Sequence, residues 1–122
     1  MKSILAVFAS LILFLATVYV TAAPKPISIP ESGVCVVEFN ASFNSGNSVS
    51  WLNNLSDCKG KRIDIATDPS MQKEHKIVVV PTIIVFSEGE EIKRFQANIM
   101  MQLEATENDV QEIIDEILMS SF

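Results

Sequence analysis

The sequence predicts a single α/β domain over residues 34–122, with a mixed central sheet flanked by helices in the order β-α-β-α-β-β-α. Two observations lead to this fold class. The strand-like segments Val34–Phe39 and Lys61–Ile65 are separated by a segment with helical spacing of its apolar residues, which predicts two parallel neighbouring strands. Thr82–Phe86 is followed after a short turn by Ile92–Phe95, which predicts an antiparallel hairpin.

The first half of the domain is predicted from apolar patterning. Val34–Phe39 is a nearly continuous apolar run, which is typical of a strand buried on both faces. Apolar residues at helical spacing predict a short helix over about residues 47–57, and the alternation in Lys61–Ile65 predicts a second strand. Because proline favours the first position of a helix, Pro69 predicts the start of another short helix that ends near Lys76.

The second half is predicted from residue type and capping. Thr82–Phe86 is rich in β-branched residues, as strands are, and residues 87–90 form the hairpin turn. Thr106 and Asp109 have the spacing of a capping box, which predicts that a helix begins there. Its apolar residues form one stripe and its acidic residues lie off that stripe, so we expect a solvated acidic face.

Composition excludes several classes of function. The 122 residues include 9 Lys and Arg against 15 Asp and Glu, for a formal net charge of −6. Such a chain is a poor nucleic-acid binder, because basic side chains that neutralise phosphates supply that affinity. Two cysteines and one histidine are too few for a four-cysteine zinc site or a histidine-rich metal site, so we expect neither metal nor cofactor.

The N-terminus has the pattern of a secretory signal. Met1–Ala22 is nearly all apolar, with Lys2 as its only charge, and small residues follow the apolar run. We therefore expect a cleaved signal peptide over residues 1–22 and export to the periplasm, the medium or a secretory lumen. The run over residues 4–20 is at the short end of lengths that span a bilayer, so an uncleaved membrane anchor is the alternative. Residues 23–33 are proline-rich and predict an extended linker.

Two segments resemble the thioredoxin family. Val37–Phe43 (VEFNASF) resembles the strand and loop that lead into its active site, and Glu38 brings it nearer to the protein disulfide isomerase version. Val80–Phe86 (VPTIIVF) and the hairpin after it resemble the cis-proline strand of the same family. The resemblance covers about residues 34–118 and implies a thioredoxin-like fold.

The redox motif of the family is missing. Family members carry two cysteines, with two residues between them, at the helix start after that loop, where the helix N-terminus stabilises the thiolate. The matching positions here are Asn44 and Asn47, and neither can form a thiolate or a disulfide. The resemblance therefore implies a domain without dithiol exchange at this site, and we lean against an enzyme. Asparagine is also a preferred helix cap, so capping is the alternative role of both residues.

The resemblance also implies a peptide groove. Pro81 matches the cis-proline of the family, and the groove would be lined by Phe43, Val80, Pro81 and the turn at Gln96 and Ala97. The alternative is that Pro81 only shapes the start of its strand and Phe43 packs in the interior. A nearby apolar segment, Ile99–Leu103, is either cover for the core or an adaptable contact surface.

Glu38 lies in the middle of the first strand and is expected to be buried, where a carboxylate needs a partner. Arg62, on the neighbouring strand, matches a lysine of the family and is the natural candidate. In active family members the acid assists proton transfer to a cysteine. Here Glu38 is either a structural relic paired with Arg62 or a group that serves another ligand.

The two cysteines lie away from the expected site. Cys35 is near the start of the first strand and Cys58 is near the start of the second, whereas chemistry in open α/β sheets lies at the opposite strand ends. Because the strand starts are neighbours, we expect a structural Cys35–Cys58 disulfide; two buried free thiols are the alternative.

Taken with the resemblance, these features predict an exported, redox-inactive thioredoxin-like domain that binds a protein or extended peptide as a chaperone-like or adaptor module. One alternative is a thiol-disulfide oxidoreductase that uses Cys35 and Cys58. Another is a membrane-tethered structural subunit, which requires that the N-terminal segment is retained.

Overall fold

The computed structural model describes residues 28–121. The expected signal peptide or anchor and residues 23–27 of the expected linker lie outside the described residues. No helix within the described range has the length and apolar character needed to cross a membrane.

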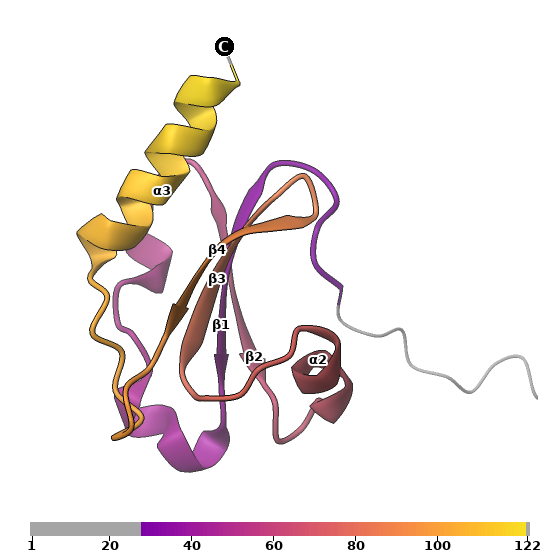
Figure 1. Ribbon diagram of the computed structural model, residues 1–122, viewed down its shortest axis with the longest axis vertical. Coiled ribbons are helices and arrows are strands. Elements are labelled where there is room, and N and C mark those ends of the chain that lie inside the picture. Colours follow the sequence, from indigo (N-terminus) through magenta and orange to yellow (C-terminus); the bar gives the residue numbers. More distant parts are fainter. Residues whose placement is uncertain (1–27, 122) are drawn as a thin grey trace, which may run out of the picture.

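Four strands form one mixed sheet (Figure 1). They are β1 (Val34–Asn40), β2 (Lys59–Asp64), β3 (Thr82–Ser87) and β4 (Glu90–Gln96), in the spatial order β2-β1-β3-β4. β1 is parallel to β2 and antiparallel to β3, and β3 is antiparallel to β4. This confirms the predicted parallel pair, the predicted antiparallel hairpin and the mixed sheet. The nearly continuous apolar strands β1 and β3 are central because both of their faces are buried.

Two helices cover the two faces of the sheet (Figure 1). α2 (Pro69–Glu74) has Pro69 in its first turn, and Met71 anchors it in the core on one face. α3 (Glu107–Ser120) lies on the other face and buries Val110 and Ile114. The predicted capping box begins α3: the Thr106 side chain accepts from the Asp109 N–H, and the Asp109 carboxylate accepts from the Thr106 N–H at 2.8 Å.

The helix predicted over residues 47–57 is wrong. Two 3-10 turns connect β1 to β2 instead, namely η2 (Ser42–Asn47) and η3 (Leu52–Asn54). Val49 lies between them, and both of its backbone groups are bonded to side chains of the sheet: its N–H donates to Glu38 and its carbonyl accepts from Arg62. These groups are therefore unavailable to a helical hydrogen-bond ladder.

The capping roles considered for Asn44 and Asn47 fail for the same reason, because no α-helix begins there. Ala41 stands at the N-terminal end of η2, which has no side-chain cap. Asn44 lies inside η2 with non-helical dihedral angles, and it is buried.

Candidate functional site

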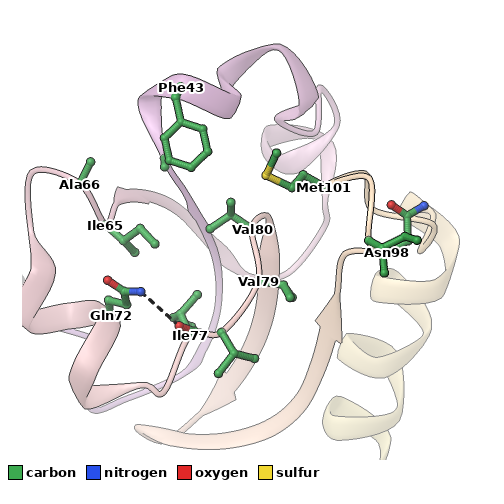
Figure 2. Close-up of a pocket in the computed structure, with 12 residues that line it drawn as sticks. Phe43, Ile65, Ala66, Gln72, Ile77, Val79, Val80, Asn98 and Met101 are labelled. Atoms are coloured by element: carbon green, nitrogen blue, oxygen red, sulfur yellow. Dashed lines mark hydrogen bonds between the residues drawn. The ribbon is translucent and has the colours of Figure 1, made fainter.

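A pocket of about 430 Å³ opens at the end of the sheet where β1 finishes (Figure 2). Five segments form its walls: η2 with Ala41 before it, the loop after β2, α2 through Gln72, the loop before β3 and the turn after β4. The lining residues carry no titratable side chain: they are Ala41, Phe43, Ile65, Ala66, Gln72, Ile77, Val78, Val79, Val80, Asn98, Ile99 and Met101. The pocket is therefore an apolar surface with two amide side chains at its wall.

Exposed apolar side chains gather around this pocket. Phe43 and Val78 are each 76% exposed, Ile99 is fully exposed and Met100 is 69% exposed. Of the seven large apolar residues that are exposed in the described part of the chain, five line or flank the pocket; the other two, Ile92 and Met119, do not. A contiguous apolar patch of this kind marks an interaction surface more often than scattered exposed residues do.

The structure brings together part of the predicted groove. Phe43 and Val80 line the pocket, and the Val80–Pro81 peptide bond is cis. Pro81 is buried behind the lining, where its carbonyl accepts from the Ala97 N–H at 3.1 Å. Gln96 ends β4 with an exposed side chain and, like Pro81 and Ala97, is not among the lining residues.

Other wall residues were not predicted. Ile77–Val79 and Ile65 belong to loops, where apolar side chains are not expected to form a shared surface. The one signal in the sequence is the apolar run that ends at Val80, directly before Pro81. The segment Ile99–Leu103 has been predicted to be either cover for the core or a contact surface, and it contains residues of both kinds. Ile99 lines the pocket, whereas Leu103 packs against the core beneath α3.

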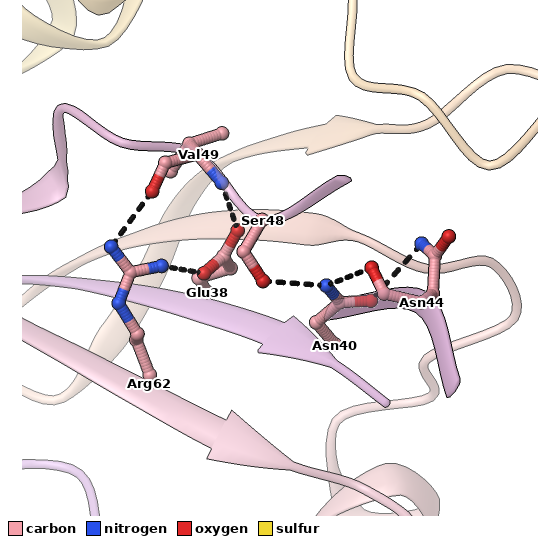
Figure 3. A network of polar contacts seen from close by, with 6 residues as sticks. All are labelled: Glu38, Asn40, Asn44, Ser48, Val49 and Arg62. Carbon is pink, nitrogen blue, oxygen red and sulfur yellow. Dashed lines mark hydrogen bonds and ion pairs between the residues drawn. The ribbon is translucent and has the colours of Figure 1, made fainter. Parts of the chain in front are cut away.

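Asn44, at the position that the resemblance matches to the first thioredoxin cysteine, is 6% exposed and belongs to a polar network; Figure 3 shows its contact with Asn40. Its Nδ2 donates to Asn40 Oδ1 at 3.2 Å, to the Val80 carbonyl at 3.4 Å and to the Met101 carbonyl at 3.2 Å. Asn47 Nδ2 donates to Asn44 Oδ1 at 2.8 Å. The two positions therefore touch each other, but they supply amides in place of thiols.

Glu38 is 1% exposed and forms an ion pair with Arg62 (Figure 3). The second carboxylate oxygen accepts from the Val49 N–H at 2.8 Å, and the guanidinium donates to the Val49 carbonyl at 2.7 Å. Both carboxylate oxygens are thus bonded within the protein. This geometry fits the structural relic rather than a group that serves another ligand.

The cysteines lie near the opposite end of the sheet. Cys35 is buried opposite Lys59 at the start of the β1–β2 pairing, and Cys58 is half-buried. Both are free thiols in this structure, which does not contain the Cys35–Cys58 bond predicted from the sequence: Cys35 belongs to the core on the α2 face, whereas Cys58 packs against the core on the α3 face. Burial raises the pKa of both thiols above the ordinary value, and Cys35 and Asp57 add to the rise at Cys58.

No model of a protein family and no curated protein matches the sequence. Solved structures do match. A thioredoxin pre-protein of Schistosoma mansoni is 19% identical, with a TM-score of 0.57 over 70% of this chain and 80% of that one. A mutant thioredoxin of Halobacterium salinarum is 19% identical, with a TM-score of 0.56 over 70% and 74%. Mitochondrial thioredoxin 3 of Saccharomyces cerevisiae is 15% identical, with a TM-score of 0.51 over 70% and 80%. The domain therefore has a thioredoxin-like fold.

Proposed function

We propose that this domain is a binding module that takes an apolar side chain of an extended protein segment into the pocket at the end of β1. The observation that carries the proposal is the pocket wall, which combines exposed apolar residues with an absence of acids, bases and thiols among its lining residues. Such a wall offers burial of apolar surface but no group for acid-base or nucleophilic chemistry. An adaptor or chaperone-like role follows.

The amide side chains at the wall are already used inside the protein. Gln72 Nε2 donates to the Ile77 carbonyl at 3.4 Å, and Asn98 Oδ1 accepts from the backbone N–H groups of Met100 and Gln102. We therefore expect recognition to depend on the size of the apolar side chain rather than on its hydrogen-bonding groups. Burying one large apolar side chain contributes roughly 1.5–3 kcal/mol, which is about a 10- to 150-fold change in affinity.

The binding experiment uses fluorescein-labelled peptides in a Gly-Ser background that differ only in a central Phe, Leu or Ser. Fluorescence polarisation is expected to give at least about tenfold tighter binding for Phe and Leu than for Ser. Phe43→Ala should weaken binding of the Phe peptide. Met119→Ala is the matched control, because Met119 is also 76% exposed but lies away from the pocket. Equal affinity for the three peptides, or equal effects of the two variants, would reject the proposal.

The proposal also includes a location outside the cytoplasm, on the basis of the apolar segment Met1–Ala22. Mass spectrometry of the protein recovered from cells that express the full chain gives the mature N-terminus. A start at or near Ala23 supports a cleaved signal. An intact N-terminus in the membrane fraction supports the tethered form instead.

The rival function, an oxidoreductase that uses Cys35 and Cys58, is tested by insulin reduction. Turnover that Cys35→Ser abolishes would replace the binding proposal. We expect no turnover, because the buried Cys35 and the apolar pocket lie at different ends of the sheet.

A further inference from the structure

We infer that Asn44 is a positioning residue whose side chain holds the walls of the pocket together through hydrogen bonds. At the position that it resembles, thioredoxins have a reactive thiol instead. The inference rests on the proposed function, since the pocket that Asn44 organises is the proposed binding site. It adds the residue that keeps the site formed when no ligand is bound.

Three walls of the pocket converge on the Asn44 side chain (Figure 3 shows its contact with Asn40). Asn44 itself lies in η2 beside Phe43, and its Nδ2 reaches the carbonyls of Val80, before β3, and of Met101, after β4. Asn40 bonds both the side chain and the backbone of Asn44. Its Oδ1 accepts from Asn44 Nδ2, and its Nδ2 donates to the Asn44 backbone carbonyl at 3.1 Å. One amide therefore joins segments separated by 36 and 57 residues in the sequence.

The turn after β4 depends most on this contact. Its internal hydrogen bonds all return to Asn98: the Asn98 N–H donates to Gln102, its carbonyl accepts from Met101, and its side chain accepts from Met100 and Gln102. The side chain of Asn98 donates to Glu104 within the same loop. Among the hydrogen bonds of residues 28–121, the bond from Asn44 to Met101 is the one that ties residues 98–102 to another segment.

The chemistry of the site requires a donor at Asn44. The three atoms that face Nδ2 are oxygens, and all three are acceptors that share the two hydrogens of the amide. An alanine there would leave them without this donor, and an ionised aspartate would place a negative charge beside them. If the turn moves when the donor is lost, a ligand must order the turn on binding, and the affinity falls.

The first experiment measures amide hydrogen exchange by NMR, which needs no ligand. In Asn44→Ala, protection of the Met101 and Gln102 amides is expected to fall about tenfold or more, while protection of the β1 and β3 amides is retained. Asn54→Ala is the matched control, because Asn54 is an exposed asparagine with no side-chain hydrogen bond in the structure. Unchanged protection of the turn in Asn44→Ala would overturn the inference.

The second experiment uses Asn44→Asp as a test that a general loss of stability would not reproduce. A protonated aspartic acid can donate to one of the three oxygens, whereas the ionised form cannot donate at all. Burial raises the pKa of a carboxyl above its usual value of about 3.9. Protection factors of the turn in this variant are therefore expected to be low near pH 8 and to recover near about pH 5.5, with no such recovery in the natural protein or in Asn54→Ala. A pH-independent loss would count against the role of the donor.

Peptide binding then separates this inference from the proposed function. Asn44→Ala should weaken the central-Phe peptide about tenfold and keep the preference for Phe over Ser. A loosened turn with unchanged peptide affinity would refute the positioning role in binding. If the natural protein binds none of the peptides, the proposed function fails, while the exchange data still decide whether Asn44 holds the turn.

Discussion

Glu38 on β1 is paired with Arg62 on β2, and between them the two side chains bond both backbone groups of Val49. This relationship links the two parallel strands to the connection that runs between them. It explains why the connection has two 3-10 turns rather than a helix. We therefore expect substitutions in the pair to change the free energy of unfolding.

Arg62→Ala is expected to destabilise the domain by about 1–3 kcal/mol, because it leaves the buried Glu38 carboxylate without its charged partner and the Val49 carbonyl without a donor. The value lies below that of a fully buried pair because the Arg62 side chain is 43% exposed. Urea unfolding measures the effect. Arg62→Lys, which keeps the charge, should lose less; equal losses in both variants would show that charge is not the deciding factor.

Asn44→Cys combined with Asn47→Cys is expected to form a disulfide, because the two asparagine side chains are in hydrogen-bond contact at 2.8 Å. Turnover in the insulin assay should stay below that of an ordinary thioredoxin, since η2 is a short 3-10 turn and supplies no long helix N-terminus to stabilise a thiolate. Intact mass before and after reduction detects the bond. The single variant Asn44→Cys is the control, and two free thiols in the oxidised double variant would contradict the geometry.

Alkylation of the native protein is expected to label Cys58 before Cys35, because Cys58 is half-buried and Cys35 is fully buried. The raised pKa of both thiols means that the thiolate fraction at neutral pH is smaller than for an ordinary cysteine, so labelling should accelerate steeply as the pH rises. Mass spectrometry of digests follows both sites, and unfolded protein provides the control. A native mass two hydrogens lower, with no labelling, would instead establish the disulfide predicted from the sequence.

Thr106→Ala is expected to cost about 0.5–2 kcal/mol, because it removes the side-chain acceptor for the Asp109 N–H at the start of α3. Urea unfolding measures the loss, and Thr106→Ser should restore most of the stability because it keeps the hydroxyl. A loss that serine does not restore would point to the methyl group of Thr106 rather than to the cap.

Local patterns in the sequence predicted the strands and the start of α3, because these elements depend on residues that are near one another in the chain. The strands follow from continuous or alternating apolar residues, and α3 follows from the capping box at Thr106 and Asp109. The helix predicted between β1 and β2 was wrong because the hydrogen bonds from Glu38 and Arg62 to the Val49 backbone override the helical spacing of the apolar residues.

The site was predicted only in part for a related reason. Resemblance supplied Phe43 and Val80, which lie in the two segments that resemble the thioredoxin family. Ile65, Val78 and Ile99 come from loops whose positions depend on how the chain folds in space, and no short-range pattern marks them as neighbours. The positioning role inferred for Asn44 likewise depends on its hydrogen bonds to the carbonyls of Val80 and Met101. The sequence alone does not show that these groups are neighbours.

The edge position of β2 has a consequence for self-association. Within residues 28–121 no strand covers its outer side, and an open strand edge is a template for another chain. This strand carries Lys59 and Lys61, in a chain whose net charge is −6, whereas its Arg62 is already paired with Glu38 and its last residue is the acid Asp64. A second copy that paired there in parallel register would bring Lys59 and Lys61 of the two strands together, which disfavours that association. Lys59 and Lys61 therefore act against pairing at this edge, while apolar side chains are exposed at the end of the sheet.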